Sequence, residues 1–371
     1  MEFKITVEEL LKALSRAQGI AERKNTIPIL ANVLIEAKAA DGLLRFTAFD
    51  LDIALVSEHP AEIIAEGAIT LPAKLLFSLA KSLTGDTVHC KVSGTTAQMA
   101  CGSAHCKIIG MPAEEYPTLP KDENVGLTRI NGRVLQDLIA KTSFAISLDE
   151  TRYVLNGLYF EAPKKGLMRA VSTDGHRLSL MTREIEDGEF QLNRGVIFPR
   201  KGLLELRRLI DEAPDAESFL GFTETSAIFK KSGLSMIMRL IDGQFPDYQE
   251  VIPQESAASG GIKLERKRFL EAIKFMTNFS DGRNSSIKLS LDKGLLKISA
   301  NTDGSEGENE LPVEYDGDRI EIGFNARYLI DALGALDQDD VIFELMDDQS
   351  PGVIRSSANK DFMAVIMPMR I

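Results

Sequence analysis

The segment Asp174-Gly175-His176-Arg177 contains the residue types that most resemble an active-site loop. A histidine beside an aspartate can act as a general base, because its ring exchanges a proton near neutral pH. The sequence supplies no obvious nucleophile for such a base. We therefore interpret the segment as a loop that shapes a binding pocket, and keep an α+β enzyme that uses His176 as base as an alternative.

A second group of reactive side chains lies in one expected hairpin, as His89-Cys90, Cys101 and His105-Cys106. Thiolates and imidazoles are ligands that zinc prefers. Adjacent strand residues face opposite sides of a sheet, so the members of each His-Cys pair cannot easily converge on one ion. We expect structural cysteines, no metal site and no cofactor.

Several classes of protein are disfavoured by what the 371 residues lack. No Walker loop, Rossmann glycine fingerprint, zinc-protease helix or Gly-x-Ser-x-Gly elbow occurs. The N-terminus lacks a signal peptide, and no apolar stretch approaches the ~18 residues of a membrane helix. Three cysteines fit a reducing compartment. These features predict a non-catalytic, cytoplasmic globular protein without a membrane partner.

The chain contains three copies of the same sequence pattern. Leu43–Asp50, Leu167–Asp174 and Leu295–Asp303 are variants of one phrase. A second phrase begins at Pro72, Pro199 and Asn325, with spacings of 127 and 126 residues. Self-similarity with so long a period indicates repeated domains. Linker-like composition at 119–127 and 252–261 predicts domains at 1–121, 128–252 and 261–371.

Each repeat is expected to contain two helices and several short alternating strands. Each repeat is expected to begin with its first helix, predicted at 7–18, 131–142 and 265–275, and the second helix is predicted at 72–83, 199–210 and 325–336. Segments such as 43–47 and 166–171 alternate as half-buried strands do. This pattern predicts an α+β fold of three similar domains, each with two helices on one face of an antiparallel sheet.

Several predicted helices carry cations opposite their apolar stripe. The net charge of −12 disfavours general adhesion to nucleic acid, but binding depends on how charge is distributed. A solvated face with ordinary ion pairs is one interpretation. The other interpretation is that these cations contact DNA phosphates independently of the base sequence. The candidate residues are Lys74, Lys81, Arg200, Lys201, Lys267 and Lys274.

Four phrases in their expected order carry a family resemblance: Thr26–Leu30, Thr173–Leu178, Asp242–Tyr248 and Met367–Arg370. With them, the chain resembles from end to end the bacterial sliding clamps, the beta subunits of the replicative DNA polymerase. The resemblance implies a head-to-tail homodimer whose six domains close into a ring around duplex DNA. It also implies a processivity role, in which the polymerase catalytic subunit, the clamp loader and repair polymerases bind through a short peptide motif.

The resemblance further implies positions for three contact sites. The peptide pocket would be formed by Leu155, Thr173, Gly175, His176, Arg177, Leu178, Pro246, Val251, Asn325, Tyr328, Val365, Ile366, Met367, Pro368, Met369, Arg370 and Ile371. Residues at positions that lie near DNA in the family are expected to contact DNA together with the six helix cations. These residues are Arg23, Lys24, Arg152 and Tyr153. Lys74, Cys106 and Ile108 would lie at the dimer interface, the latter two on an expected edge strand at 104–109. A repeat-built peptide adaptor that does not enclose DNA is a further alternative.

Overall fold

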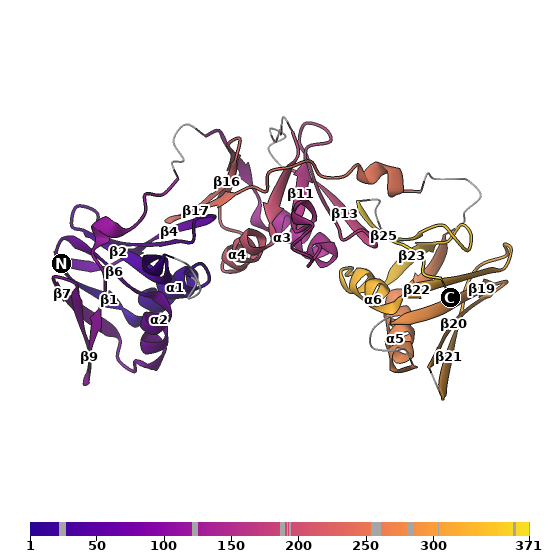
Figure 1. Cartoon of the computed structure of the whole chain (residues 1–371), viewed down its shortest axis with the longest axis horizontal. Coiled ribbons are helices and arrows are strands. Elements are labelled where there is room, and N and C mark those ends of the chain that lie inside the picture. The colour runs from indigo at the N-terminus through magenta and orange to yellow at the C-terminus, as the bar shows by residue number, and fades with distance from the viewer. Residues whose placement is uncertain are drawn as a thin grey trace. The chain divides into compact units, whose positions relative to one another are not determined.

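The computed structural model describes residues 1–21, 27–120, 125–185, 190, 192, 194–253, 261–279, 285–302, 304–358 and 361–370 (Figure 1). Six α-helices lie within these ranges, two in each repeat. They are α1 (Val7–Gln18), α2 (Ala73–Ser82), α3 (Gly132–Thr142), α4 (Arg200–Asp211), α5 (Arg266–Met276) and α6 (Ala326–Gly334). Within the described ranges, no helix combines the length and apolar character that crossing a membrane requires.

The helices form where the sequence offers both an apolar stripe and a cap. Leu10, Leu14 and Ala17 of α1 are buried, and Thr6 Oγ1 accepts a hydrogen bond from the N–H of Glu9 (3.2 Å) at its start. Such a cap satisfies one of the backbone donors that a helix start leaves unpaired. The predicted bounds of α1 are reproduced, and those of the other helices differ by one or two residues.

Strands make up most of the remaining chain. The first repeat contains β1 (Glu2–Thr6), β2 (Asn32–Lys38), β3 (Leu43–Phe49), β4 (Ile53–Pro60), β5 (Glu62–Ala65), β6 (Gly67–Pro72), β7 (Thr87–Ser93), β8 (Thr96–Cys101) and β9 (Ala104–Ile109). The second contains β10 (Leu127–Ile130), β11 (Gly157–Glu161), β12 (Leu167–Thr173), β13 (Arg177–Glu184), β14 (Val196–Pro199), β15 (Ser218–Phe222), β16 (Ser226–Lys231) and β17 (Leu234–Arg239). The third contains β18 (Ile262–Glu265), β19 (Ser286–Asp292), β20 (Leu295–Thr302), β21 (Ser305–Pro312), β22 (Ile320–Asn325), β23 (Asp340–Glu344), β24 (Gly352–Ser356) and β25 (Phe362–Ile366).

The strands form four antiparallel sheets, two of which join neighbouring repeats. One eight-stranded sheet has the order β10-β15-β16-β17-β4-β3-β2-β6, and the other has β14-β11-β12-β13-β25-β24-β23-β18. The joining pairs are β4 with β17 and β13 with β25. A five-stranded sheet β5-β1-β7-β8-β9 and a four-stranded sheet β21-β20-β19-β22 complete the fold. Consequently β9 and β21 each lie at a sheet edge.

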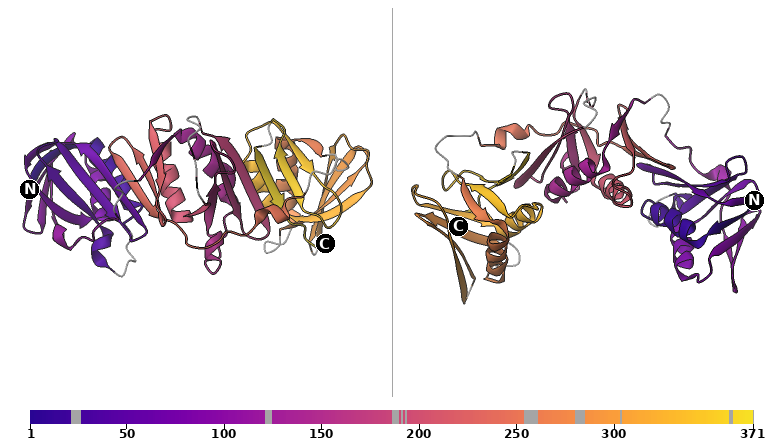
Figure 2. Two further views of the ribbon diagram at one scale, coloured as in Figure 1. Left: turned by 90° about the horizontal axis from the view of Figure 1, so that it is seen from above. Right: turned by 180° about the vertical axis from the view of Figure 1, so that it is seen from behind.

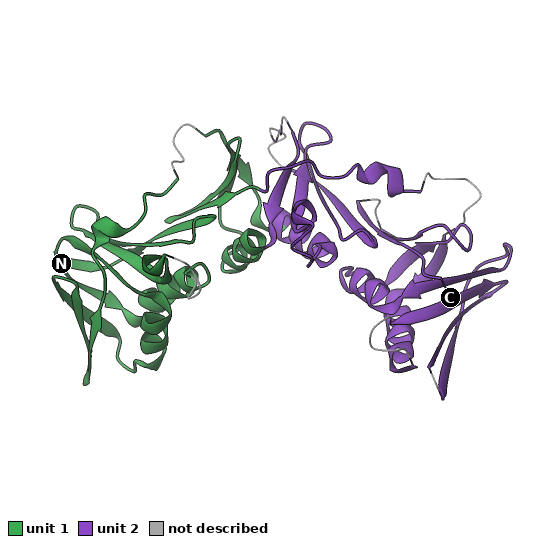
Figure 3. Ribbon diagram, viewed as in Figure 1, with its two compact units in different colours: residues 1–133, 201–240 green, residues 134–200, 241–371 purple. Residues whose placement is uncertain are grey.

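The chain divides into two compact units that do not coincide with the repeats (Figure 3). Unit 1 contains Met1–Arg133 and Lys201–Leu240, and unit 2 contains Val134–Arg200 and Ile241–Ile371. Each unit holds one eight-stranded sheet and one smaller sheet. In the views of Figure 2, α5 and α6 lie together within unit 2, as α1 and α2 do within unit 1.

One part of the sequence-based expectation was wrong. The first helix of each repeat was expected to open its repeat, but β1, β10 and β18 precede α1, α3 and α5. These strands are only four or five residues long. So short a segment carries too few alternations to stand out against the stronger helical pattern that follows it.

Candidate functional site

The segment Thr173–Arg177 forms a tight turn between β12 and β13 that its own side chains hold. Asp174 Oδ1 accepts hydrogen bonds from the backbone N–H groups of His176 and Arg177, at 2.9 and 3.1 Å. Thr173 Oγ1 accepts a bond from the N–H of Gly175 (3.1 Å) and donates one to the carbonyl of Arg177 (2.7 Å). The aspartate therefore holds the backbone of the turn, which differs from the use of an aspartate to orient a catalytic histidine ring.

Gly175 is required by the geometry of this turn. Its φ of +87° lies in the left-handed region, where a side chain is disfavoured. A Cβ atom at this position would lie 2.9 Å from Nη1 of Arg152. The same Nη1 donates a hydrogen bond to the carbonyl of Asp174 (3.3 Å), so Arg152 fastens the turn from outside.

Arg177 is enclosed by charges and rings of unit 2. Its Nε donates to Asp174 Oδ2 (3.0 Å) and its Nη1 to Asp331 Oδ2 on α6 (2.5 Å). The guanidinium carbon lies 4.5 Å from the ring centre of Tyr328 and 5.5 Å from that of Phe144. Burial raises the pKa of the Tyr328 phenol, which therefore keeps its proton. With only 12% of its side chain exposed, Arg177 forms a fixed wall of the site.

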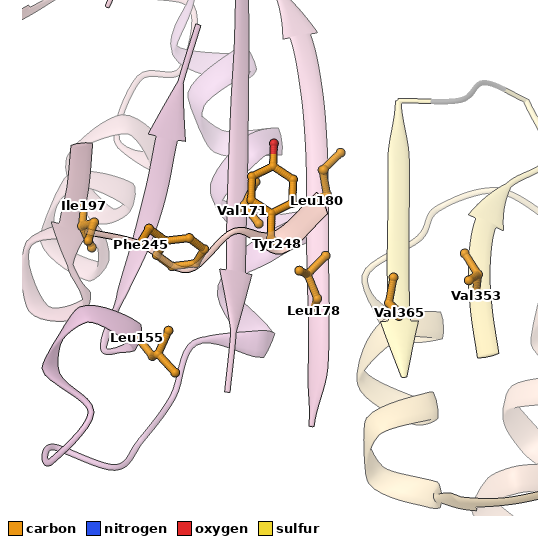
Figure 4. Packing of buried hydrophobic residues seen from close by; sticks show 9 residues of the cluster. All are labelled: Leu155, Val171, Leu178, Leu180, Ile197, Phe245, Tyr248, Val353 and Val365. Atoms are coloured by element: carbon orange, nitrogen blue, oxygen red, sulfur yellow. The ribbon is translucent and has the colours of Figure 1, made fainter. Parts of the chain in front are cut away.

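An apolar cluster lies beside the turn, where β13 pairs with β25; we call it the β13–β25 cluster (Figure 4). In the ladder, Leu178 is directly opposite Val365. Tyr159 packs against the cluster, and its ring stacks on that of Phe245, a cluster member, with centres 4.8 Å apart. The cluster consists of Leu155, Val171, Leu178, Leu180, Ile197, Phe245, Tyr248, Val353 and Val365.

The C-terminal segment borders this cluster and is fixed by backbone bonds. The N–H of Met367 donates to the carbonyl of His176 (2.9 Å), and the N–H of Met369 donates to the carbonyl of Gly323 (2.8 Å). Met367 is 38% exposed, so a flexible apolar side chain reaches the surface next to the turn. Pro368 is half-buried and Arg370 is exposed, and Ile371 lies outside the described residues.

The structure brings most of the sequence-predicted pocket residues together. Leu155, Leu178 and Val365 belong to the cluster, and the rings of His176 and Tyr328 stack with centres 6.4 Å apart. Pro246 is exposed between two cluster members, and Val251 is 42% exposed at the end of the short helix Tyr248–Val251. Asn325 caps α6, its Oδ1 accepting the N–H of Arg327 (2.9 Å), one turn before Tyr328.

Sequence reasoning missed six members of the cluster. Phe245 and Tyr248 lie on either side of Pro246 in the phrase Asp242–Tyr248, so their aromatic character was the available signal. The others are ordinary apolar strand residues, whose contacts depend on which strands pair. These are Val171, Leu180, Ile197 and Val353.

Comparison with known proteins identifies the family. Residues 1–120, 129–247 and 249–370 match, in order, the N-terminal, central and C-terminal domains of the DNA polymerase III beta subunit. The chain belongs to this family. The beta sliding clamp of Caulobacter vibrioides is 35% identical over 99% of this chain and 100% of its own length.

Solved structures agree with this assignment. The DNA polymerase III subunit beta of Pseudomonas aeruginosa has a TM-score of 0.93 and 35% identity, with all of both chains covered. The P. aeruginosa clamp bound to griselimycin has the same TM-score at 34% identity, again with full coverage of both chains. The chain is therefore a DNA sliding clamp of replication built from three clamp domains, as the repeats had predicted.

The predicted DNA-binding cations lie on different elements of the two units. Lys81 is exposed on α2 and its Nζ lies 4.4 Å from the ring centre of Phe77, while Lys74 of the same helix is half-buried. On α5, Lys267 and Lys274 are both exposed. Arg200, Arg152 and Tyr153 are exposed too. Arg23 and Lys24 lie outside the described residues.

Lys201 differs from the other cations. Its Nζ donates to Asp50 Oδ2 at 2.5 Å, and the Asp50 side chain is 7% exposed. Asp50 Oδ1 accepts the N–H groups of Asp52 and Ile53, at 3.0 and 2.6 Å. Lys201 thus fixes the start of α4 to the β3–β4 turn, and much of its charge is neutralised there.

Two of the residues predicted for the dimer interface, Cys106 and Ile108, lie on an edge strand, whereas Lys74 lies on α2. β9 runs from Ala104 to Ile109, within the predicted bounds, and it ends its sheet. Cys106 is half-buried, whereas the side chain of Ile108 is 4% exposed and packs inward. The apolar side chain that this edge exposes is Ile109, at 72%.

The histidines and cysteines of the β7–β9 hairpins point to different sides. Cys90 and Cys101 are buried, whereas His105 is exposed and His89 binds Glu2, with Nε2 and Oε1 2.9 Å apart. Burial raises the pKa of the Cys90 thiol to about 12, so it remains protonated. Across the described ranges, no group of three histidine, cysteine or acidic side chains is arranged to hold a metal ion.

Proposed function

We propose that two copies of the chain join head to tail and enclose duplex DNA in a closed ring. The observation that carries this proposal is that β9 of the first repeat and β21 of the third repeat are both edge strands. An open edge can accept a strand from another chain, and two such contacts related by symmetry close a ring. Each chain would contribute three domains, at 1–121, 128–252 and 261–371, and Lys74, Cys106 and Ile108 would lie near the joint.

Inside the ring, phosphates would be met by cations of helices and loops. Lys81, Lys267, Lys274 and Arg200 carry exposed charges suited to weak, sequence-independent contacts. The proposed set also includes Arg23, Lys24, Lys74, Arg152, Tyr153 and Lys201. Such contacts allow sliding because they do not depend on the base sequence.

A short apolar peptide from the polymerase catalytic subunit would bind over the β13–β25 cluster. Met367 and Val251 offer apolar surface there, and methionine adapts its shape to different ligands. His176 is exposed beside them, and Asp174 and Asp331 hold Arg177 in place. The clamp loader and repair polymerases would use the same surface in turn. A tethered polymerase gains a high effective concentration at its template in the cytoplasm.

Retention on DNA tests the enclosure. Protein loaded on nicked circular DNA should stay bound through gel filtration in high salt, and should be lost once the circle is cut. Equal loss from circular and linear DNA would contradict the ring. A sedimentation mass near twice 40.8 kDa at micromolar concentration is expected as well.

The same chain tests the two alternatives. The proposal assigns it no catalytic step, so His176→Ala should weaken peptide binding and abolish no turnover. An adaptor that does not enclose DNA would bind the peptide but fail to increase polymerase processivity. Both measurements need only the full chain, a polymerase and a primed circle.

A further inference from the structure

The outward face of the β9 edge is basic and contains a histidine. Along β9, His105, Lys107 and Ile109 are exposed and alternate with Cys106 and Ile108, which point toward the core. The pairing places His105 opposite Ala100 of β8, which is opposite His89 of β7. An open hollow of about 450 Å³ covers this face, lined by His89, Lys91, Gln98, Met99, Ala100, His105, Cys106 and Lys107.

The outward face of the β21 edge is acidic. Glu306, Glu308 and Glu310 are exposed, and they alternate with residues that point inward. A Cβ on Gly307 would lie 2.4 Å from the Phe279 ring, which shows how closely that inward face is packed. Glu308 is already paired with Lys297 of β20, at 2.5 Å. A strand added to this edge would therefore lie beside a row of carboxylates.

We propose that protonation of His105 strengthens the contact between β9 of one copy and β21 of the next, so that ring closure depends on pH. This inference rests on the ring dimer proposed above. Every outward position from 306 to 310 is a glutamate, so His105 meets a carboxylate whichever of these residues it faces. An opposite-charge pair across two strands is favourable, and a neutral imidazole lacks that attraction.

The charged groups near His105 determine the direction of the effect. Within its own chain, His105 shares the hollow with polar side chains from three strands. These are His89 and Lys91 from β7, Gln98 from β8, and Lys107 and Cys106 from β9. From α2, Leu79, Ser82 and Leu83 line the neighbouring apolar cavity, together with Cys101 and His105, and none of these α2 residues is charged. Glu2 of β1 pairs with His89 and Lys91 (2.9 and 3.4 Å), whereas Lys107 lies beside His105 on its own strand. The second copy would add Glu306, Glu308 and Glu310, with Lys297 bound to Glu308. This environment is more acidic than that of the separate chain, so dimerisation favours the protonated ring, and protonation favours the dimer to the same extent.

The dimer dissociation constant, measured by sedimentation at constant ionic strength, tests the inference. We expect it to be about fivefold lower at pH 6 than at pH 8, because each ring contains two exposed pairs of modest strength. His105→Gln should remove this difference and give the wild-type value of pH 8 throughout. His105→Arg should give tight dimers at both pH values.

A control separates His105 from the neighbouring histidine. His89 is bound to Glu2 of its own chain with or without a partner, so His89→Gln should retain the pH dependence. An unchanged dissociation constant from pH 6 to 8, or full pH dependence in His105→Gln, would overturn the inference and leave the ring intact. Absence of any dimer at micromolar concentration would instead contradict the proposed ring itself.

Discussion

Arg177 Nη1 donates a hydrogen bond to Asp331 Oδ2 over 2.5 Å, which links the first residue of β13 to α6 within unit 2. The same guanidinium lies against Tyr328, one turn earlier on α6. A residue of the family phrase Thr-Asp-Gly-His-Arg is therefore positioned by the third repeat. The shape of the proposed peptide site depends on this bond.

Replacing Asp331 by asparagine should weaken peptide binding about threefold and change the melting temperature little. The carboxylate is 43% exposed, so its ion pair contributes little to stability but fixes the orientation of Arg177. Fluorescence anisotropy with a labelled polymerase peptide measures the affinity. Asp340→Asn is the matched control, because its 2.8 Å pair with Lys263 lies outside the cluster. An equal loss in both variants would count against a specific role for Asp331.

Gly175→Ala should lower the free energy of unfolding by about 2 kcal/mol. A left-handed φ costs a side chain on the order of 1 kcal/mol, and the new Cβ would also displace Arg152. Gly294→Ala is a suitable comparison, since its φ is +74° and no atom lies within 4 Å of the added carbon. Urea unfolding should show the larger loss for Gly175→Ala, and similar losses would exclude the Arg152 contact as a cause.

Leu51→Asn should stabilise unit 1 by about 0.5 kcal/mol. Leu51 is 47% exposed with a φ of +82°, in a turn that Asp50 holds as Asp174 holds the turn at Gly175. Asparagine tolerates this backbone conformation better than leucine does. A rise in the urea midpoint checks the prediction. A fall would mean that the apolar contacts of the leucine side chain outweigh the strain.

The stability of unit 1 should decrease as the pH falls below about 6.5. His59 Nδ1 lies 2.7 Å from Glu9 Oε2 and its Nε2 lies 3.1 Å from Ser57 Oγ. Burial lowers the pKa of His59 below its usual 6.5, so the unfolded chain takes up the proton first. The stability that neutral His59 contributes is present above pH 6.5, and it is lost as the pH falls through the pKa of His59 in the folded state.

His59→Gln should flatten this part of the stability curve. Glutamine can still donate to Glu9 but does not titrate, so urea midpoints at pH 7.5 and 5.5 should lie closer together than in the wild type. His176→Gln provides the control, because His176 is exposed. A curve as steep as that of the wild type would assign the pH dependence to other groups.

Combining Lys81→Ala with Lys274→Ala should weaken loading on primed DNA and reduce its salt dependence. Each lost phosphate contact lowers the slope of log K against log salt by about 0.9. Lys263→Ala serves as control, because Lys263 lies on β18 with Asp340 2.8 Å away and is not among the proposed DNA contacts. Equal effects of the control and the double variant would remove these helices from the proposed DNA contacts.

Local features of the fold were predictable from the sequence, and pairings between repeats were not. Apolar spacing and capping residues lie within one helix, so α1 was predicted with its bounds. The alternation of β9 is local too. The pairing of β4 with β17 depends on backbone hydrogen bonds between distant segments, which leave no residue-specific signature.

The same distinction applies to the site. Gly175 and Leu178 could be assigned from the family resemblance, but Phe144 and Asp331, which enclose Arg177, could not. Lys201 has the charge and helix position of a DNA contact, and no local pattern indicated that it also binds Asp50. Whether a surface cation is free or paired is decided by the segment that folds against it, and the sequence pattern does not contain that information.

The two eight-stranded sheets make neighbouring repeats depend on each other. The sequence repeats with a period of 126 or 127 residues, yet each of these sheets combines strands of two successive repeats. A single repeat on its own would leave the edge strand at that seam unpaired, and an unpaired edge is prone to aggregation. We therefore expect a fragment cut at a repeat boundary to be less soluble than the whole polypeptide.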